Sequence, residues 1–280
     1  MDKVKLNNGI EMPILGYGVY QVTPEECEHC VLDAISAGYR SIDTAQAYHN
    51  EEGVGNAISK CGIPREELFI TTKVWISNAG YEKAKASIEE SLRKLKSDYI
   101  DLLLIHQPFG DYYGTYRAME EAYKAGKVRA IGVSNFYPDR FVDLAEFCEI
   151  TPAVNQVETH VFNQQIKLQE VMKEYGTKIM SWGPFAEGRN DFFTNATLQE
   201  IGKEYGKSVA QVALRYLIQR DIIVIPKSTH KERMIENFNV FDFSLTPDAM
   251  AAIAALDTAK TLFFSHNDPE MVKWLINYSK

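Results

Sequence analysis

The chain has 280 residues, of which 45% are hydrophobic and 24% are charged, and its formal net charge is -8 at pH 7. This length and apolar content suit one α/β barrel domain over residues 1–280. The negative charge gives no general attraction for nucleic acid or anionic membranes, and no segment approaches the ~20 consecutive apolar residues that cross a bilayer. The charged N-terminus and only four cysteines predict a cytoplasmic protein without a disulfide framework.

Two short strand-like pieces flank the turn pair Asn8-Gly9 near the N-terminus, and they predict a hairpin that plugs the bottom of a barrel. Beyond this hairpin, apolar runs of strand length cover residues 14–18, 39–45, 68–74, 99–106, 128–134, 153–158, 178–184 and 222–228. Most of these runs are continuous rather than alternating in hydrophobicity. Continuous runs are typical of parallel strands that are buried on both faces.

Helices are predicted between these strands. Thr23-Pro24 is a capping residue followed by a proline, Tyr81–Leu95 has apolar residues at helical spacing, and Ser208 begins a capping box. Thr246-Pro247 begins a further helix, and an extra loop and helix are expected around residues 185–205. Strands and helices in alternation predict a (β/α)8 TIM barrel with extra C-terminal helices. A doubly wound open sheet is the alternative, because periodicity does not reveal closure.

Four side chains of catalytic type stand at the ends of predicted strands, where the active site of a β/α barrel lies. Asp43 and Tyr48 follow the second strand. Lys73 lies near the end of the third strand, and His106 ends the fourth. Each residue alone is compatible with packing or capping, but their joint position on one rim favours catalysis.

This set of side chains suits the reduction of a carbonyl group. Hydride delivery to a carbonyl carbon produces an alkoxide that needs a proton, and free tyrosine, with a pKa of ~10, is a weak acid for that step. A neighbouring Lys73 cation would favour the phenolate and make Tyr48 a better acid, while Asp43 would hold the lysine charged and oriented. His106 would donate a hydrogen bond to the carbonyl oxygen.

Several segments closely resemble the aldo-keto reductase superfamily, and they occur in order over nearly the whole chain: SIDTAQAYHNEEGVG, FITTKVW, DLLLIHQP, GVSNF and IPKSTHKERMIEN. The bacterial branch with 2,5-diketo-D-gluconate reductases and glyoxal or methylglyoxal reductases looks nearest. The resemblance implies a monomeric, NADPH-dependent oxidoreductase that acts on small aldehydes and ketones. It implies that the catalytic tetrad is Asp43, Tyr48, Lys73 and His106, with Tyr48 as the proton donor.

The cofactor site is not a dinucleotide fingerprint, since no third glycine follows Gly16 and Gly18 at the required spacing. A phosphate site is instead expected after the eighth strand, where Lys227-Ser228-Thr229 opens a helix that also carries Arg233. The resemblance implies that this segment holds the adenosine 2′-phosphate of NADPH. It also implies that two residues of the same helix contact the adenine, namely Glu236 and Asn237.

The nicotinamide end of the cofactor is expected at other strand ends. The resemblance implies that its carboxamide is held by Ser134, Asn135 and Gln156, and that Trp182 stacks on its ring. Phe185 belongs to a loop, residues 183–192, that is expected to cover the pyrophosphate. The remaining expected cofactor contacts are Gly18, Asp43 and Thr229.

The expected substrate contacts follow the barrel strands and are Tyr20, Tyr48, Trp75, His106, Gln107 and Phe109. Gln107 departs from the family pattern, because relatives commonly have tryptophan directly after the catalytic histidine. His49 stands where relatives often have glycine, and it is interpreted as an exposed loop residue or as a pocket residue that affects preference. The short, polar C-terminal segment LFFSHNDPEMVKWL predicts small polar carbonyl substrates such as glyoxals and keto-sugars.

Two further motifs are interpreted as structural. Cys27 and Cys30 form a C-x-x-C inside the predicted first helix, without a second cysteine pair for zinc. Glu51-Glu52 is interpreted as a solvated helix start. No metal site is expected, and a metal-dependent barrel hydrolase is an alternative for which few ligands are available, with His160 just beyond the sixth strand. The other alternative is a non-catalytic NADPH-binding regulatory or structural protein.

Overall fold

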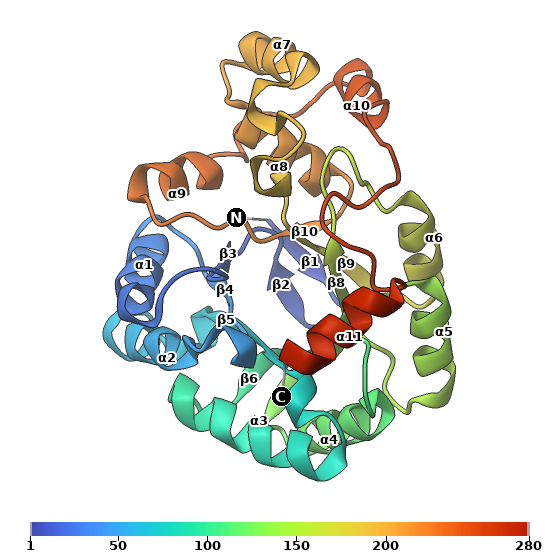
Figure 1. The fold of residues 1–280 in the computed structure, drawn as a ribbon. Helices are drawn as coiled ribbons and strands as arrows, with labels where there is room; N and C mark the ends of the chain where they lie inside the picture. The colour runs from blue at the N-terminus through green and yellow to red at the C-terminus, as the bar shows by residue number, and fades with distance from the viewer. Residues whose placement is uncertain (1, 279–280) are drawn as a thin grey trace.

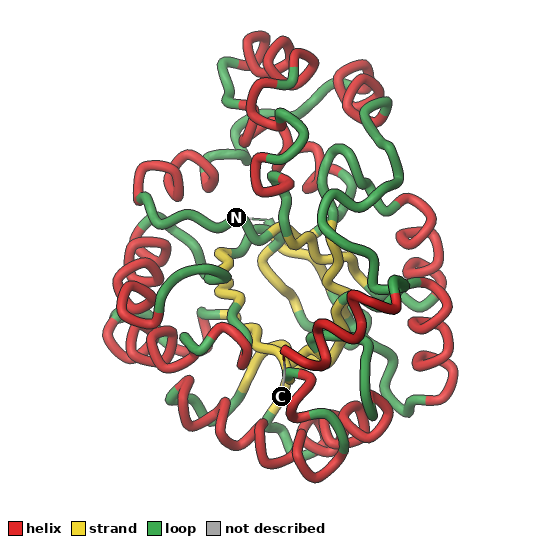
Figure 2. The backbone as a smooth tube through the Cα atoms, viewed as in Figure 1, coloured by secondary structure: helices red, strands yellow, loops and turns green. Residues whose placement is uncertain are grey.

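The computed structural model describes residues 2–278, and its main feature is one parallel sheet of eight strands (Figure 2). Along the sheet the strands follow the chain order: β3 (Tyr17–Gly18), β4 (Ser41–Asp43), β5 (Phe69–Val74), β6 (Ile100–Ile105), β7 (Val128–Ser134), β8 (Val154–Glu158), β9 (Lys178–Trp182) and β10 (Ile223–Val224). Each of the predicted apolar runs contains one of these strands. Nearly all of their residues are buried, which explains why the runs are continuous.

The sheet closes on itself between its first and last strands. Leu15 forms a parallel bridge with Val224, the amide of Gly16 donates to the Val224 carbonyl at 2.8 Å, and the amide of Val224 donates to Ile14 at 2.9 Å. The prediction of a (β/α)8 barrel is therefore confirmed, and the open doubly wound sheet is excluded. Gly18 lies at this seam, where a Cβ atom would meet the carbonyl oxygen of Ile225 at 2.9 Å.

The predicted N-terminal hairpin is present. Its strands β1 (Lys3–Lys5) and β2 (Glu11–Pro13) pair antiparallel, and the side chain of Asn8 in the turn donates to the carbonyl of Arg129 at 2.9 Å. Asn7 donates to the carbonyl of Pro152 at 3.1 Å. Because Arg129 and Pro152 stand where β7 and β8 begin, the hairpin covers the N-terminal end of the barrel, opposite the rim that carries the polar side chains.

Helices surround the barrel (Figure 1). They are α1 (Pro24–Ser36), α2 (Glu51–Lys60), α3 (Tyr81–Leu95), α4 (Tyr112–Lys124), α5 (Pro138–Phe147), α6 (Ile166–Glu174), α7 (Ala196–Tyr205), α8 (Val209–Gln219), α9 (Lys231–Phe238), α10 (Pro247–Ala254) and α11 (Pro269–Tyr278). The predicted caps are confirmed, since the side chains of Thr23, Ser208 and Thr246 each accept a backbone N–H of the first turn. No helix within residues 2–278 combines the length and apolar character needed to cross a membrane.

Two insertions extend the simple repeat and border the polar rim. The connection after β9 contains the 3-10 helices η4 (Ala186–Gly188) and η5 (Phe192–Thr194) before α7, as expected for residues 185–205. After α10 the chain returns to the barrel and ends in α11, drawn in red across the front of the barrel in Figure 1. The extra C-terminal helices are therefore confirmed, and the tail covers part of the rim.

Candidate active site

The C-terminal rim of the barrel brings together four polar side chains, those of Asp43, Tyr48, Lys73 and His106. Asp43 ends β4, Lys73 lies in β5, and His106 directly follows β6. Tyr48 ends the 3-10 helix η1 (Gln46–Tyr48), which connects β4 to α2. The ammonium of Lys73 is 2.6 Å from Asp43 Oδ1 and 3.4 Å from the Tyr48 hydroxyl, so these three polar groups form one cluster.

Lys73 and Asp43 form an ion pair that is almost entirely removed from water, with side-chain exposures of 0% and 3%. Lys73 also donates to the carbonyl of Thr44 at 2.8 Å, and the amide of Gln156 donates to Asp43 Oδ2 at 2.8 Å. Burial raises the pKa of Asp43 and lowers the pKa of Lys73, while the partner charge opposes each shift. The additional hydrogen bonds fix the geometry of the pair.

The acidity of Tyr48 differs from the sequence expectation. Its pKa is raised well above the usual value, first because the phenol is buried and then because the charge of Asp43 disfavours the phenolate. Lys73 does not reverse this shift, since its charge is shared with the carboxylate only 2.6 Å away. The net shift of the Tyr48 pKa is therefore opposite to the expectation, although the ammonium 3.4 Å away still favours the phenolate over the phenol.

His106 is a neutral imidazole. Burial lowers its pKa well below the usual value, and the charge of Lys73 lowers the pKa further. The ring lies against those of Trp75, at 4.9 Å between centroids, and Tyr48, at 5.5 Å, both nearly edge-on. Within the described part of the chain its Nδ1 is buried without a hydrogen-bond partner. A neutral ring held in this way can donate one N–H hydrogen bond but carries no charge.

Hydrogen bonds join this cluster to the residues predicted at the nicotinamide. Gln156, which lies in the middle of β8 rather than at its end, donates to the aspartate, and Ser134 donates to the Gln156 carbonyl at 2.9 Å. The amide nitrogen of Asn135 donates to the carbonyl of His106 at 3.1 Å. Trp182 Nε1 in turn donates to Asn135 Oδ1 at 2.9 Å. The structure therefore brings these side chains into one connected polar surface.

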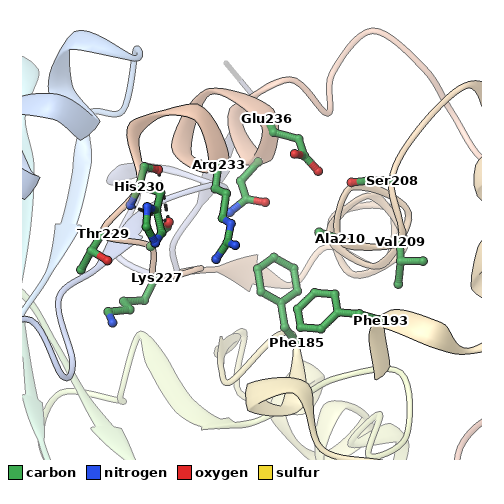
Figure 3. Close-up of a pocket in the computed structure, with 12 residues that line it drawn as sticks. Phe185, Phe193, Ser208, Val209, Ala210, Lys227, Thr229, His230, Arg233 and Glu236 are labelled. Carbon is green, nitrogen blue, oxygen red and sulfur yellow. Dashed lines mark hydrogen bonds between the residues drawn. The ribbon is translucent and has the colours of Figure 1, made fainter. Parts of the chain in front are cut away.

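A pocket of about 520 Å³ lies between the segment after β10 and the start of α8 (Figure 3). Its lining includes Phe185 and the residues predicted for the adenosine end of a cofactor: Lys227, Ser228, Thr229, Arg233, Glu236 and Asn237. In Figure 3 the guanidinium of Arg233 reaches toward the rings of Phe185 and Phe193. Cations beside a helix N-terminus suit a phosphate group, and exposed aromatic rings suit a flat heterocycle.

One detail of this segment is corrected by the structure. Helix α9 begins at Lys231 with His230 as its capping position, so Lys227-Ser228-Thr229 forms the preceding loop and does not itself open the helix. Ser228 accepts the backbone N–H of His230 at 3.0 Å, which bends the loop into the helix. The pocket also has lining residues that were not predicted from the sequence, namely Phe193, Ser208, Val209, Ala210 and His230. The capping box at Ser208 is a sequence signal for some of these residues, because it marks a second helix N-terminus at the pocket.

The open side of the rim carries aromatic side chains. The ring of Tyr20 is 52% exposed and lies 5.1 Å from that of Tyr48, while Trp75 lies against His106. His49 is exposed and has a φ of 57°, in the left-handed region that favours glycine. His49 is thus an exposed loop residue, and it also lines a pocket of about 500 Å³ together with Trp75, so features of both interpretations of His49 are present.

The tail covers the other side of the rim. His266 Nε2 lies 2.8 Å from Gln107 Oε1, and the backbone N–H of His266 donates to the Tyr137 hydroxyl at 3.2 Å. The ring of Phe109 is only 5% exposed and stacks on His266 at 6.0 Å. Gln107 and Phe109 thus support the tail, and Phe109 retains little free surface at the pocket mouth.

The prediction of a solvated helix start is wrong for Glu51. Glu51 begins α2, as expected, but it is 2% exposed, whereas its neighbour Glu52 is exposed. Its carboxylate accepts the hydroxyl of Thr72 at 2.7 Å, and burial raises its pKa. The first turn of α2 packs toward β5 and α3, and the sequence pattern did not reveal this contact.

The remaining candidate groups are structural. Cys27 and Cys30 are buried in α1, and burial raises the pKa of the Cys27 thiol to about 12, far from the range of reactive cysteines. His160 is paired with Glu158 at 2.9 Å. In residues 2–278 no group of three or more histidine, cysteine or acidic side chains is arranged to hold a metal ion.

Comparisons with known proteins agree with this geometry. The aldo/keto reductase family profile matches residues 14–258. Glyoxal reductase of Bacillus subtilis (strain 168) is 48% identical over 258 residues, which span 91% of this chain and 93% of that protein. An aldo-keto reductase from a Medee basin deep-sea metagenome library superimposes with a TM-score of 0.93 at 44% identity, covering 95% of this chain and 98% of the other.

A further solved structure, a Bombyx mori aldo-keto reductase in complex with NADP, has a TM-score of 0.89 at 36% identity and covers 100% of this chain and 99% of its own. Identity at this level over nearly the whole length, together with the family profile, is decisive for family membership. The protein is an oxidoreductase that belongs to the aldo-keto reductase family.

Proposed function

We propose that this protein reduces small aldehydes and ketones to alcohols with NADPH. The observation that carries the proposal is the cluster at the rim, where the Tyr48 hydroxyl lies 3.4 Å from Lys73 and its ring lies beside neutral His106. A phenol that holds its proton and a neutral imidazole both offer hydrogen bonds to an uncharged carbonyl oxygen. Their convergence on one rim fits carbonyl reduction.

The pocket of Figure 3 supports NADPH as the cofactor. Arg233 and Lys227 would hold the 2′-phosphate with Ser228 and Thr229, and the adenine would lie against Glu236 and Asn237. The relative from Bombyx mori is known in complex with NADP. When bound, NADPH supplies the hydride that the carbonyl carbon accepts.

The nicotinamide end would lie at the polar surface that continues from the tetrad. In the proposal Ser134, Asn135 and Gln156 hold the carboxamide and Trp182 faces the ring. The hydrogen bonds among these side chains support it, since they orient the amides before a ligand binds. Gly18, at the end of β3, and Phe185, in the loop after β9, complete the proposed contacts.

Proton delivery is proposed as the work of Tyr48. The carbonyl oxygen accepts the phenolic proton as negative charge develops on it, and the Lys73 ammonium then stabilises the phenolate through the 3.4 Å contact. Asp43 and Thr44 orient the ammonium by accepting two of its hydrogen bonds. His106 donates a hydrogen bond to the same carbonyl oxygen and aims it at the phenol.

The proposed substrates are small polar carbonyls, with glyoxals and keto-sugars as the leading classes. Glyoxal reductase of Bacillus subtilis is one of the similar proteins. The tail contact between His266 and Gln107 narrows the rim, and Tyr20 and Trp75 offer aromatic surface beside the tetrad. This arrangement favours compact substrates over large apolar ones.

Replacing Tyr48 by phenylalanine tests the proposal. The variant should bind NADPH normally, measured by quenching of tryptophan fluorescence, and lose roughly 100- to 10,000-fold in the reduction of methylglyoxal, because the proton donor is gone. The assay follows NADPH oxidation at 340 nm over a panel of aldehydes, keto-sugars and keto-acids.

Tyr175→Phe is the matched control, since Tyr175 bonds Glu146 on the surface and should keep full activity. Wild-type turnover in Tyr48→Phe would overturn the assignment of the donor. A wild-type protein that binds NADPH but oxidises it with no member of the panel would favour the non-catalytic alternative.

We also propose that residues 1–280 act as one domain and as a monomer in the cytoplasm. One barrel sheet unites all the parallel strands, and the four cysteines are free thiols, as suits a reducing compartment. Light scattering during gel filtration should give a mass near 31.8 kDa. A measured mass of twice that value would show a dimer and contradict the proposed monomer.

A further inference from the structure

Gln46 lies two residues before Tyr48 in η1, and its side-chain amide is engaged on both sides. Its oxygen accepts the backbone N–H of Trp75 and the side-chain amide of Asn78, each at 2.9 Å. Its nitrogen donates to Ser91 Oγ at 3.1 Å and to the carbonyl of Ser87 at 3.3 Å. This one amide therefore ties the short helix that carries Tyr48 to the end of β5 and to α3.

Glu51 provides a second connection on the other side of Tyr48. Its buried carboxylate accepts the hydroxyl of Thr72 at 2.7 Å, and the nearby hydroxyl of Ser91 lowers the pKa of Glu51 against the effect of burial. Ser91 is itself 0% exposed and accepts from Gln46. The two connections thus meet at Ser91, and they form one hydrogen-bonded network outside the barrel wall.

Residues of the network flank both Tyr48 and Lys73 in the sequence. Gln46 and Glu51 stand two residues before and three residues after Tyr48. Thr72 and Trp75 stand one residue before and two residues after Lys73. Because side chains alternate along a strand, Lys73 extends to the tetrad while Thr72 points to the opposite face, toward α2. The backbones that carry the two catalytic side chains are therefore joined on the face opposite the reaction.

We propose that Gln46 and Glu51 are positioning residues for the proton donor, because the network that they form with Ser91, Thr72 and Trp75 fixes the distance between Tyr48 and Lys73. The inference rests on the proposed role of Tyr48. The Lys73–Tyr48 contact of 3.4 Å is longer than the 2.6 Å contact of Lys73 with Asp43, so a small shift of η1 would remove it. Among the described residues, no side-chain hydrogen bond joins either residue to the tetrad, so each positions the donor through the backbone of its own element, and the charge of Glu51 also favours the charged form of Lys73.

Gln46→Met tests the inference, because methionine keeps the length of the side chain and removes its polar contacts. We expect kcat to fall about 10- to 100-fold, as for a donor misplaced by a fraction of an ångström to an ångström, while the dissociation constant of NADPH stays unchanged. The solvent deuterium isotope effect on kcat should rise above the wild-type value, since proton delivery then limits the rate. Ser91→Ala removes the meeting point of the network with little change in volume and should act in the same direction.

The controls separate positioning from general loss of structure. Gln164→Met removes a fully buried amide that bonds Val161, Ile253 and Tyr216, far from η1 in the chain, and Glu52→Gln alters the exposed neighbour of Glu51. Gln164→Met should lower the melting temperature at an unchanged isotope effect, and Glu52→Gln should change neither quantity.

The inference is overturned if Gln46→Met and Ser91→Ala keep the wild-type kcat and isotope effect while Tyr48→Phe is inactive. It is also overturned if both variants lose activity only in proportion to their unfolded fraction, at the wild-type isotope effect. If instead Tyr48→Phe is fully active, the proposed function fails first, and the two failures are distinguishable.

Discussion

The phenol of Tyr48 lies 3.4 Å from a lysine ammonium, yet its pKa is raised and not lowered. The reason is that burial disfavours the phenolate and the charge of Asp43 adds to this effect, while the ammonium is shared with the same carboxylate. A phenol with the ordinary pKa of ~10 is already protonated near neutral pH, so the raised pKa leaves the resting state of Tyr48 unchanged and makes unaided proton transfer harder. Lys73 then acts on the phenolate that proton transfer leaves behind.

At the residue scale, Arg233 should give the protein its preference for NADPH over NADH. Arg233→Ala removes a guanidinium that lines the pocket proposed for the adenosine end of the cofactor, and NADPH should bind roughly 10- to 100-fold more weakly, the value of a charged hydrogen bond. NADH lacks the 2′-phosphate and should bind with little change. Quenching of tryptophan fluorescence measures both affinities.

The control is Arg93→Ala, which removes an exposed arginine paired with Glu90 on α3. Equal losses of NADPH and NADH affinity in Arg233→Ala would contradict a role in binding the 2′-phosphate.

At the scale of elements, the tail before α11 is held by a few polar contacts that range from buried to exposed. Glu158 accepts the backbone N–H of Leu262 at 2.9 Å and the hydroxyl of Thr261, and Arg189 of the loop after β9 donates to the Leu262 carbonyl at 2.7 Å. His266 then docks on Gln107, the residue after the tetrad histidine. The tail therefore links the loop proposed to cover the cofactor with the rim proposed to bind the substrate.

Docking of the tail should depend on pH through His266. Burial lowers its pKa from 6.5 to about 4, so the docked state favours the neutral ring. The docking free energy is fully present above pH 6.5 and falls as the pH drops toward 4, by about 3 kcal/mol in total. Hydrogen exchange of residues 259–268 at pH 7.5 and pH 5 measures the loss. In His266→Gln the exchange of this segment should change less between the two pH values, and an equal change in both proteins would assign the effect to other groups.

At the scale of the whole molecule, the barrel depends on a narrow seam between its first and last strands. β3 and β10 are two residues long, and Gly18 passes the carbonyl of Ile225 so closely that an added Cβ would lie 2.9 Å from it. The seam also leads directly into Lys227 and Ser228. Closure of the barrel and the shape of the pocket proposed for the adenosine end of NADPH are therefore set by the same segment.

Gly18→Ala should destabilise the protein by about 1–3 kcal/mol, because neither backbone can yield without opening the seam. Thermal unfolding followed by circular dichroism measures this loss, and NADPH affinity should fall with it. Gly206→Asn is the control, since Gly206 ends α7 in a left-handed conformation that asparagine tolerates and has open space at the Cβ position. An unchanged melting temperature for Gly18→Ala would mean that the seam can relax.

The sequence by itself determined the elements and the common rim of the four side chains proposed as the tetrad. Buried parallel strands must be apolar throughout, and helix starts need capping side chains, so both leave local patterns that a single chain reveals. The position of Asp43, Lys73 and His106 at the carboxyl ends of such strands fixes their common rim, since these ends of parallel strands meet at one end of a barrel. Family motifs then indicated which side chains accompany them.

Only the tertiary structure decided closure, burial and the charge balance of the site. The sequence pattern predicts a surface position for Glu51, because the start of its helix is polar. The contact with β5 that buries Glu51 joins segments from different β/α repeats. The raised pKa of Tyr48 and the docking of His266 on Gln107 likewise depend on groups distant in sequence. Burial and electrostatic coupling are properties of the packed molecule, and no local pattern encodes them.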